Sequence, residues 1–406
     1  MTGWLRATRP LTDRLRLQMA TDPEQVAALV LRQFQRLPAK RRPQVRDNGL
    51  HEWVPLSGIV AEKDAKGNAL HDWHAEILAI RAFNRYLLDE CNSHLQGAAS
   101  DFIRKREPSE ISTDSPQPFA IKDDVKLHMY CSEAPCGDAS MELTMAAQDD
   151  ASPWQVPDSA FASVPGAADA ESLPGRAYFS QLGVVRRKPA RGDAPPTTSK
   201  SCSDKLALKQ CTSLLSSLAS LLVHPGNAYL ATLVLPESQH SAAACERSFS
   251  ESGRLRALAG AQWHGGYGFF PFRVRTTARE FEFSRRSVGT RAGAERIAAS
   301  NLAAAWTASG VDEGTMGGVL QGRKAFDVRG ASLVSRRRMW ELAAALTGRL
   351  KGHGAELLRR AVDVETYAQV KGGKLLADRR EAKRIAREES LAGWVVNVGD
   401  DDFSRL

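Results

Sequence analysis

Residues 71–85 read HDWHAEILAIRAFNR, and this stretch decides the fold assignment. It places His74 and Glu76 two positions apart, at the start of a run in which apolar residues recur every three or four positions. That period predicts an amphipathic helix. One face of the helix would carry Ile77, Ile80, Asn84 and Leu87. A His-x-Glu pair alone is common in proteins, so its meaning depends on the rest of the sequence.

The composition is that of a globular protein, since 43% of the 406 residues are hydrophobic and can form a sizeable core. No apolar run is long enough to span a bilayer, and the N-terminus lacks the apolar centre of a secretory signal. We therefore expect an intracellular protein, in the nucleus or the cytoplasm, without a membrane partner. The formal net charge of +8 favours a polyanionic partner such as RNA, although it also suits many basic enzymes.

The sequence contains 6 cysteines at irregular spacing. In a reducing compartment such cysteines are core residues or metal ligands rather than a disulfide framework.

The chain divides into a short extension and one folded region. Residues 1–20 are rich in arginine and are expected to be a disordered extension; a targeting peptide and an RNA-contacting arm are the alternatives. The fold is expected to occupy residues 21–406, beginning with Thr21 as the N-cap of a helix and Glu24 completing a capping box. Residues 98–120 and 147–200 are rich in Pro, Ser, Asp and Ala, which predicts loop insertions.

Strands and helices alternate over most of the folded region. Strands are predicted around Gly58 and at residues 125–131, 227–235 and 279–286, and helices at 211–222 and within 364–389. This alternation predicts one domain of the α/β or mixed α+β class.

A metal site that activates water requires three protein ligands and one open position, and thiolates with a neutral imidazole suit zinc. His74 supplies an imidazole, and Cys136 in PCGDAS supplies a thiolate. Nucleobase deaminases share the signature His-x-Glu followed by Pro-Cys-x-x-Cys, in which the glutamate is not a ligand. Ala139 stands where the second cysteine would be. Either the third ligand comes from elsewhere, or the site is inactive.

Cys202, in KSCSDKLALK, is the best candidate for the third ligand, because it lies among small polar residues before a helix-forming segment. The weaker candidates are Cys131, Cys211 and Cys245. Any one cysteine is more commonly a buried apolar residue. The combination of His74, Glu76 and Cys136 with the SCSDK phrase is what favours a site.

These phrases resemble the adenosine-to-inosine editase domain shared by ADAR enzymes and the eukaryotic tRNA-specific adenosine deaminases. Further phrases resemble the fungal tRNA branch, namely RDNGLHEWVPLSGIV, LVLPESQ, RVRTTAREFEFSRR and GWVVNVGDDDFSRL. The resemblance implies a cytidine-deaminase-like mixed sheet between helices, with a helical C-terminal extension. It also implies zinc held by His74, Cys136 and Cys202, with Glu76 as the proton shuttle.

The implied activity is hydrolytic deamination of adenosine to inosine in tRNA, at adenosine 37 of alanine tRNA. One alternative is ADAR-like editing of other structured RNA, and another is a non-catalytic RNA-binding protein with structural zinc. Glu76 argues against the latter, because a structural zinc site does not need a non-ligand carboxylate. Phosphate contacts are expected from basic runs at residues 103–106, 185–188 and 335–338, and no DNA partner is expected.

The resemblance implies a second ligand, an inositol hexakisphosphate buried beneath the active site. Its contacts would be Arg81, Lys205, Tyr367, Lys371, Trp394 and, by a weaker alignment, Lys383. Without the resemblance, such residues would be assigned to a solvated face. A buried basic cluster, in contrast, requires a negative partner. The sequence departs from the ADAR pattern at Ile80, Leu208 and Asn397, where ADARs carry basic residues.

Overall fold

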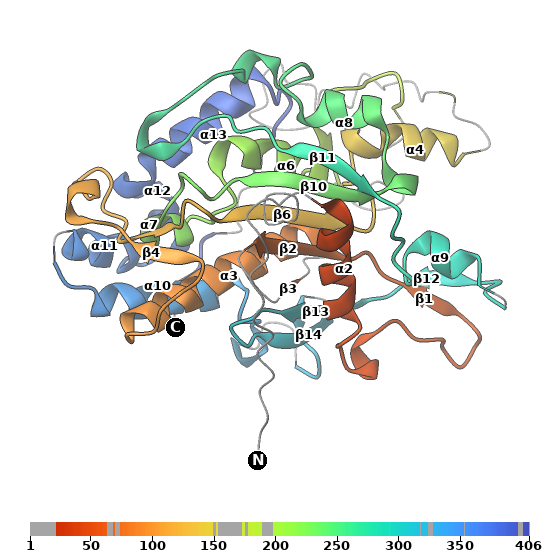
Figure 1. The fold of residues 1–406 in the computed structure, drawn as a ribbon, viewed down its shortest axis with the longest axis horizontal. Helices are drawn as coiled ribbons and strands as arrows, with labels where there is room; N and C mark the ends of the chain where they lie inside the picture. The colour runs from red at the N-terminus through yellow and green to blue at the C-terminus, as the bar shows by residue number, and fades with distance from the viewer. Residues whose placement is uncertain are drawn as a thin grey trace, which may run out of the picture.

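The computed structural model describes residues 22–62, 68–69, 74–148, 152, 173–174, 178–188, 198–291, 293–316, 318–323, 328–352, 354–396 and 401–405 (Figure 1). The extension expected at residues 1–20, most of the insertion expected at 147–200, and Asn397 lie outside these ranges.

A five-stranded mixed sheet lies at the centre, with the strand order β11-β10-β6-β2-β3 (Figure 1). Its strands are β2 (Ser57–Glu62), β3 (Asn68–Ala69), β6 (Lys126–Cys131), β10 (Leu230–Pro236) and β11 (Arg273–Thr277). β10 runs parallel to both β6 and β11, whereas β2 is antiparallel to β6 and to β3. The predicted strands around Gly58, at 125–131 and at 227–235 are thereby confirmed.

Both faces of the sheet are covered, which explains why β6 is buried almost throughout. Met129 belongs to a core with residues of α3 (Ala75–Leu95) and α6 (Cys202–Thr212). Its neighbour Tyr130 points the other way and packs in a second core with residues of α2 (Pro23–Phe34), which crosses the sheet in Figure 1. The expected mixed α+β class is confirmed.

Smaller sheets flank the central one. They pair β1 (His51–Trp53) with β12 (Ile297–Ala299), β4 (Ile103–Lys105) with β5 (Phe119–Ile121) and β9 (Val223–His224), β7 (Leu173–Pro174) with β8 (Arg186–Arg187), and β13 (Leu302–Trp306) with β14 (Asp312–Met316) and β15 (Val319–Leu320).

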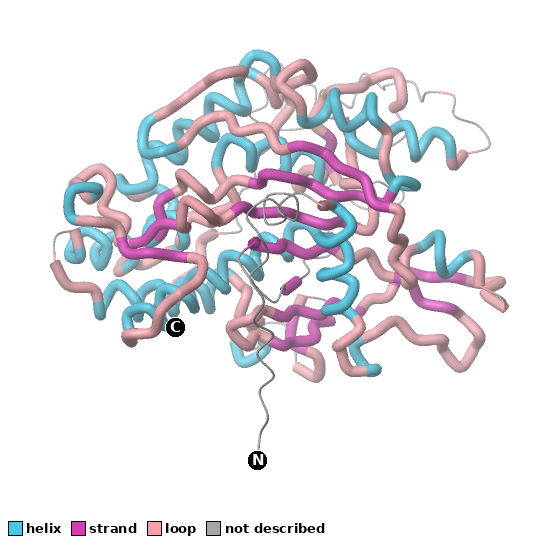
Figure 2. Tube along the Cα trace, viewed as in Figure 1, coloured by secondary structure: helices cyan, strands magenta, loops and turns pink. Residues whose placement is uncertain are grey.

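The remaining α-helices are α4 (Met141–Ala146), α7 (Ala219–Leu222), α8 (Ala242–Phe249), α9 (Arg285–Gly289), α10 (Arg336–Arg349), α11 (Ala355–Val362), α12 (Tyr367–Gly372) and α13 (Ala377–Glu389). The short 3₁₀ turns are η1 (Ala39–Arg41), η2 (Pro108–Glu110), η3 (Asp138–Ser140), η4 (Glu237–Gln239), η5 (Arg256–Leu258), η6 (His264–Gly266), η7 (Val328–Gly330) and η8 (Lys374–Leu376). Figure 2 shows that α10 to α13 gather at one end of the sheet, as expected for a helical C-terminal region.

The first helix is capped differently from the prediction. Asp22, not Thr21, is the N-cap residue, and its carboxylate accepts a hydrogen bond from the N–H of Glu24. The Glu24 carboxylate does not complete a capping box. It accepts hydrogen bonds from the Thr277 hydroxyl at 2.6 Å and the Ala278 N–H at 2.7 Å. This links the start of α2 to the end of β11.

The segment at residues 98–120 is not a simple loop. It contains β4 and the start of β5, which pair antiparallel. Ile103 and Phe119 are fully buried. Burial of these two apolar side chains favours strand pairing here, although most of the residues around them are polar.

The helix predicted over residues 211–222 is interrupted at residues 213–218 and is wrong for that half of its length. α6 ends at Thr212, and Ser213 has a left-handed φ of 55°. The Asn84 side chain donates to the Leu214 carbonyl at 2.9 Å and accepts from the Ser216 N–H at 2.5 Å. Asn84 thus replaces hydrogen bonds that a continuous helix would make. Within the predicted segment, the chain becomes helical again at α7.

The strand predicted at residues 279–286 is also wrong, since the strand here is β11 and α9 begins after Ser284. Phe281 and Phe283 alternate with charged residues because both rings pack against Phe34 of α2, with centroids 4.7 Å and 5.4 Å away. The alternation reflects this aromatic cluster rather than strand pairing.

Candidate active site

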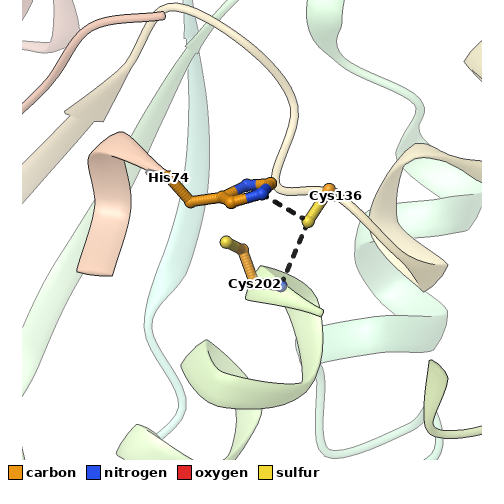
Figure 3. Close-up of side chains that lie close together, drawn as sticks. All are labelled: His74, Cys136 and Cys202. Atoms are coloured by element: carbon orange, nitrogen blue, oxygen red, sulfur yellow. Dashed lines mark hydrogen bonds between the residues drawn. The ribbon is translucent and has the colours of Figure 1, made fainter. Parts of the chain in front are cut away.

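Three side chains converge where three elements begin or end (Figure 3). His74 is the N-cap residue of α3, Cys136 follows β6, and Cys202 is the first residue of α6. Their potential ligand atoms lie within 4.8 Å of one another. The His74 Nδ1 is 3.5 Å from the Cys136 Sγ, and the Cys202 N–H donates to the same sulfur at 3.3 Å. The three residues predicted as ligands are therefore brought together.

The electrostatics of the two thiols suit a cation. A hydrogen bond from the Cys202 thiol is the main cause that lowers the pKa of Cys136 well below its usual value, and His74 and Lys188 contribute. Burial raises the pKa of the Cys202 thiol. The pair therefore favours one thiolate and one thiol. A bound cation would favour release of the remaining proton.

Glu76 lies on the first turn of α3 and is 6% exposed. Burial raises the pKa of its carboxyl above 4.5, and the nearby His74 opposes that rise. A carboxyl group with a raised pKa holds a proton more readily than an exposed carboxyl group does, as a proton shuttle requires. This environment fits the predicted role of Glu76.

Lys188 is a site residue that the motif analysis missed. Its Nζ donates to the Cys202 Sγ at 3.8 Å. Its charge also favours the ionised forms of Glu76 and Cys136. Lys188 lies in the basic run at 185–188, which was assigned to RNA contacts, and no local pattern distinguishes it from its neighbours.

The turn after Cys136 is fastened to the start of α6. The Ser203 hydroxyl donates to the carbonyls of Pro135, at 2.9 Å, and Cys136, at 3.0 Å. The same hydroxyl accepts a hydrogen bond from the Ala139 N–H at 3.1 Å. The Ser203 N–H also donates to the Cys136 carbonyl at 3.0 Å. Position 139, where a second cysteine would stand in the common signature, is therefore bound to the segment that carries Cys202.

The residues predicted to hold a polyanion lie on α3, α6, α12, α13 and the segment after α13. Burial, followed by Arg379, Arg387, Lys371 and Lys200, lowers the pKa of Lys383 to about 7. The charges that act most strongly on Lys383 among the described residues are thus positive. A partly buried cation among cations is unfavourable without a negative partner.

The other predicted contacts of the polyanion vary in their surroundings. Lys205 donates to the Ser199 hydroxyl at 3.2 Å, and Lys371 forms an ion pair with Asp401. Tyr367 is buried and stacks on another ring. The charge of Arg81 acts on Tyr367, so the two lie near each other. The Trp394 ring lies 5.2 Å from the Lys200 Nζ.

The prediction overlooked several members of this basic cluster, namely Lys200, Lys209, Arg379 and Arg387. Helical spacing could have found three of them: Lys209 follows Lys205 by one turn of α6, and Arg379, Lys383 and Arg387 recur every four residues along α13. α6 and α13 are in contact. Ile80 and Leu208, the departures from the ADAR pattern, are buried in the core.

Some side chains in two of the basic runs expected to contact RNA have structural roles. Arg186 is 1% exposed. Arg104 pairs with Glu110, and Arg106 donates to the carbonyls of Ser115 and Gln117. Side chains that hold loops in this way are less available to phosphates.

The site combines an imidazole, two thiols and a buried carboxylate, and it lies beside a mixed sheet. This combination is typical of the class of hydrolytic nucleobase deaminases. The model of the adenosine-deaminase (editase) domain matches residues 59–398. The chain belongs to this family and is therefore an enzyme that deaminates adenosine.

Among similar proteins, a "tRNA-specific adenosine deaminase 1" of Schizosaccharomyces pombe is 32% identical over 93% of this chain and 95% of its own length. The protein of the same name from Saccharomyces cerevisiae is 31% identical over 52% of this chain and 59% of its own length. A "Double-stranded RNA-specific editase Adar" of Drosophila melanogaster is 27% identical over 43% of this chain and 24% of its own length. Within the described part of the chain, no helix has the length and apolar character needed to cross a bilayer.

Proposed function

We propose that this enzyme converts adenosine to inosine in tRNA by hydrolytic deamination, with adenosine 37 of an alanine tRNA as its substrate. The observation that carries the reaction is the buried Glu76 carboxyl beside the cluster of His74, Cys136 and Cys202. The tRNA substrate is supported by the Schizosaccharomyces pombe relative, whose similarity extends over nearly the whole of both chains.

We propose His74, Cys136 and Cys202 as the ligands of a zinc ion. One imidazole nitrogen and two sulfurs within 4.8 Å fit the donor set of catalytic zinc, which leaves a fourth position open. When bound, zinc would lower the pKa of water to about 7 and so would make hydroxide available at neutral pH.

Glu76 is assigned the proton transfers. Its carboxylate takes a proton from the attacking water and delivers it to N1 of adenine as the water oxygen bonds to C6. It then transfers the second water proton to the amino nitrogen, the C6–N bond breaks, and ammonia leaves. One water is consumed, and inosine and ammonia are formed. The raised pKa of Glu76 helps it to hold a proton between these transfers.

An anticodon loop suits this enzyme as a substrate. The adenosine must leave its stack to reach a buried carboxylate, and the cost is low where bases are already unpaired. Editing of other structured RNA is the second candidate, favoured by the similarity to the double-stranded-RNA editase over 43% of the chain. We propose no DNA substrate, and we place the enzyme in the nucleus or the cytoplasm.

Inositol hexakisphosphate is the proposed ligand of the basic cluster formed by Lys200, Lys205, Lys209, Arg379, Lys383 and Arg387. The support is physical: burial and neighbouring cations lower the pKa of Lys383 to about 7 and that of Lys200 to about 8. A polyanion would offset both effects. Mass spectrometry of the small molecules released on denaturation tests this assignment, with the Lys383→Gln variant expected to release less.

The substrate is tested by inosine formation on three RNAs. These are an alanine tRNA transcript, the same transcript with adenosine 37 replaced by guanosine, and a long RNA duplex. We expect inosine only in the first. Conversion of the duplex alone would contradict the tRNA assignment and favour the second candidate. Absence of inosine from all three, with metal-loaded protein, would favour the non-catalytic alternative.

A further inference from the structure

The two thiol ligands are followed by the same pattern. The sequence reads Cys136-Gly137-Asp138 in one segment and Cys202-Ser203-Asp204 in the other. Asp138 and Asp204 are both 0% exposed. The deamination chemistry assigns neither carboxylate a role.

Asp138 receives three kinds of donor. The Arg247 Nε lies 3.1 Å from each carboxylate oxygen, the Ser248 hydroxyl donates at 2.8 Å, and the Gly183 N–H donates at 2.8 Å. Arg247 also donates to the Asp138 carbonyl at 3.0 Å. The segment after Cys136 is therefore held through both the carboxylate and the main-chain carbonyl of Asp138.

Asp204 is bound by the same three kinds of donor. The Arg254 Nη1 lies 2.7 Å from one oxygen, and the other accepts from the Ser201 hydroxyl at 2.5 Å and the Arg186 N–H at 3.0 Å. Each aspartate thus has one guanidinium, one hydroxyl and one main-chain N–H. These three donors offset the free-energy cost of removing a carboxylate from water.

The two arginines belong to one tightly turned segment, residues 247–254. The Arg254 N–H donates to the Arg247 carbonyl at 2.9 Å, and the Arg254 Nε donates to the Ser248 carbonyl at 3.2 Å. Gly253 packs so closely here that a Cβ would lie 2.3 Å from the Glu246 carbonyl oxygen. The backbone of this turn therefore holds Arg247 and Arg254 close together.

We propose that residues 247–254 act as a clamp that sets the separation of Cys136 and Cys202, with Asp138 and Asp204 as its positioning residues. In the Pro-Cys-x-x-Cys signature, two ligands lie in one turn and local backbone geometry fixes their distance. Here the sulfurs belong to residues 66 apart in sequence, on different elements. Because position 139 is an alanine and not a cysteine, the local backbone cannot fix the distance between the two sulfurs. The clamp fixes that distance instead. This inference rests on the proposed metal-dependent deaminase.

The test measures cobalt(II) binding to metal-free, full-length protein by competition with a chelator. The thiolate-to-cobalt absorption band reports the geometry of the two sulfurs. Asp138→Asn and Asp204→Asn keep the side-chain shape but remove the charge. The matched control is Asp89→Asn, because Asp89 also accepts from an arginine, Arg85 at 2.9 Å, and from a serine, Ser309 at 2.8 Å, on a distant part of α3.

We expect both clamp variants to weaken cobalt binding by about 10- to 100-fold and to shift the absorption band, since groups that orient metal ligands have effects of this size. Asp89→Asn should leave affinity and band unchanged, whatever it does to urea unfolding. If an Asn variant fails to fold, Ser248→Ala removes one hydrogen bond from Asp138 and should still weaken binding.

Unchanged affinity and band in the folded variants would overturn the clamp while leaving the deaminase assignment intact. Failure of the unaltered protein to bind cobalt would instead contradict the metal site itself, and with it both proposals.

Discussion

Gly137 and Ser201 are in such close contact that a Cβ at position 137 would lie 2.2 Å from the Ser201 hydroxyl oxygen. Gly137 follows Cys136, and Ser201 precedes Cys202, so this contact joins the two thiol-bearing segments. Gly137 also has a φ of +104°. Only glycine allows both this close contact and this positive φ without strain.

Gly137→Ala should therefore weaken both the fold and the metal site. Gly97→Ala is the matched control, because Gly97 has a φ of +90° but a Cβ added there would have no neighbouring atom within 4 Å. The control isolates the backbone strain, about 1–2 kcal/mol. Urea unfolding should show a larger loss for Gly137→Ala, with reduced cobalt affinity in that variant alone. Equal effects in the two variants would argue against a close contact.

The assignment of the third ligand predicts a difference between two cysteines of α6. Cys202→Ser should lose metal and activity, whereas Cys211→Ser should retain both, since Cys211 is a buried thiol whose pKa burial raises to about 12. Metal content by elemental analysis and inosine formation are measured together. Metal retained at full stoichiometry in Cys202→Ser would point to a different third ligand.

The basic cluster predicts an unusual dependence of stability on pH. In protein free of bound polyanion, Lys383 has a folded-state pKa of about 7, below its ordinary value of 10.5. Between these pH values the unfolded state binds more protons, so the free energy of unfolding should rise with pH, by at most about 1.4 kcal/mol per pH unit from this group.

Lys383→Met should reduce this rise, although Lys200, whose pKa is lowered to about 8, still contributes to it. The variant should also be more stable at pH 7, as measured by urea unfolding at pH 7, 8 and 9. Lys40→Met, at an exposed position, is the control and should keep the wild-type slope. A falling or flat slope in polyanion-free wild-type protein would contradict a desolvated Lys383.

Much of this site could be predicted from the sequence because its chemistry lies in short motifs. His74 and Glu76 share one helix start, and PCGD and SCSD each carry their cysteine in a recognisable local context. The central strands were also predictable, since their apolar runs are local signals.

The partners of these motifs could not be predicted, because they come from distant segments. Asp138 meets Arg247, 109 residues away, and Asp204 meets Arg254, 50 residues away. Neither pairing leaves a periodic signal in the sequence. The end of α6 has a similar cause, since Asn84 on α3 binds the chain near Ser216. The alternation at Phe281 and Phe283 misled the strand prediction because a tertiary contact with Phe34 produced it.

The most direct test of the central claim compares Glu76→Gln with the unaltered enzyme in single-turnover inosine formation on alanine tRNA, with zinc content measured in both. We predict that Glu76→Gln binds zinc at the same stoichiometry and loses activity by about 100- to 10,000-fold, the usual contribution of a general acid–base group. Near-normal turnover in a zinc-loaded Glu76→Gln variant would contradict the role of Glu76 as the proton shuttle.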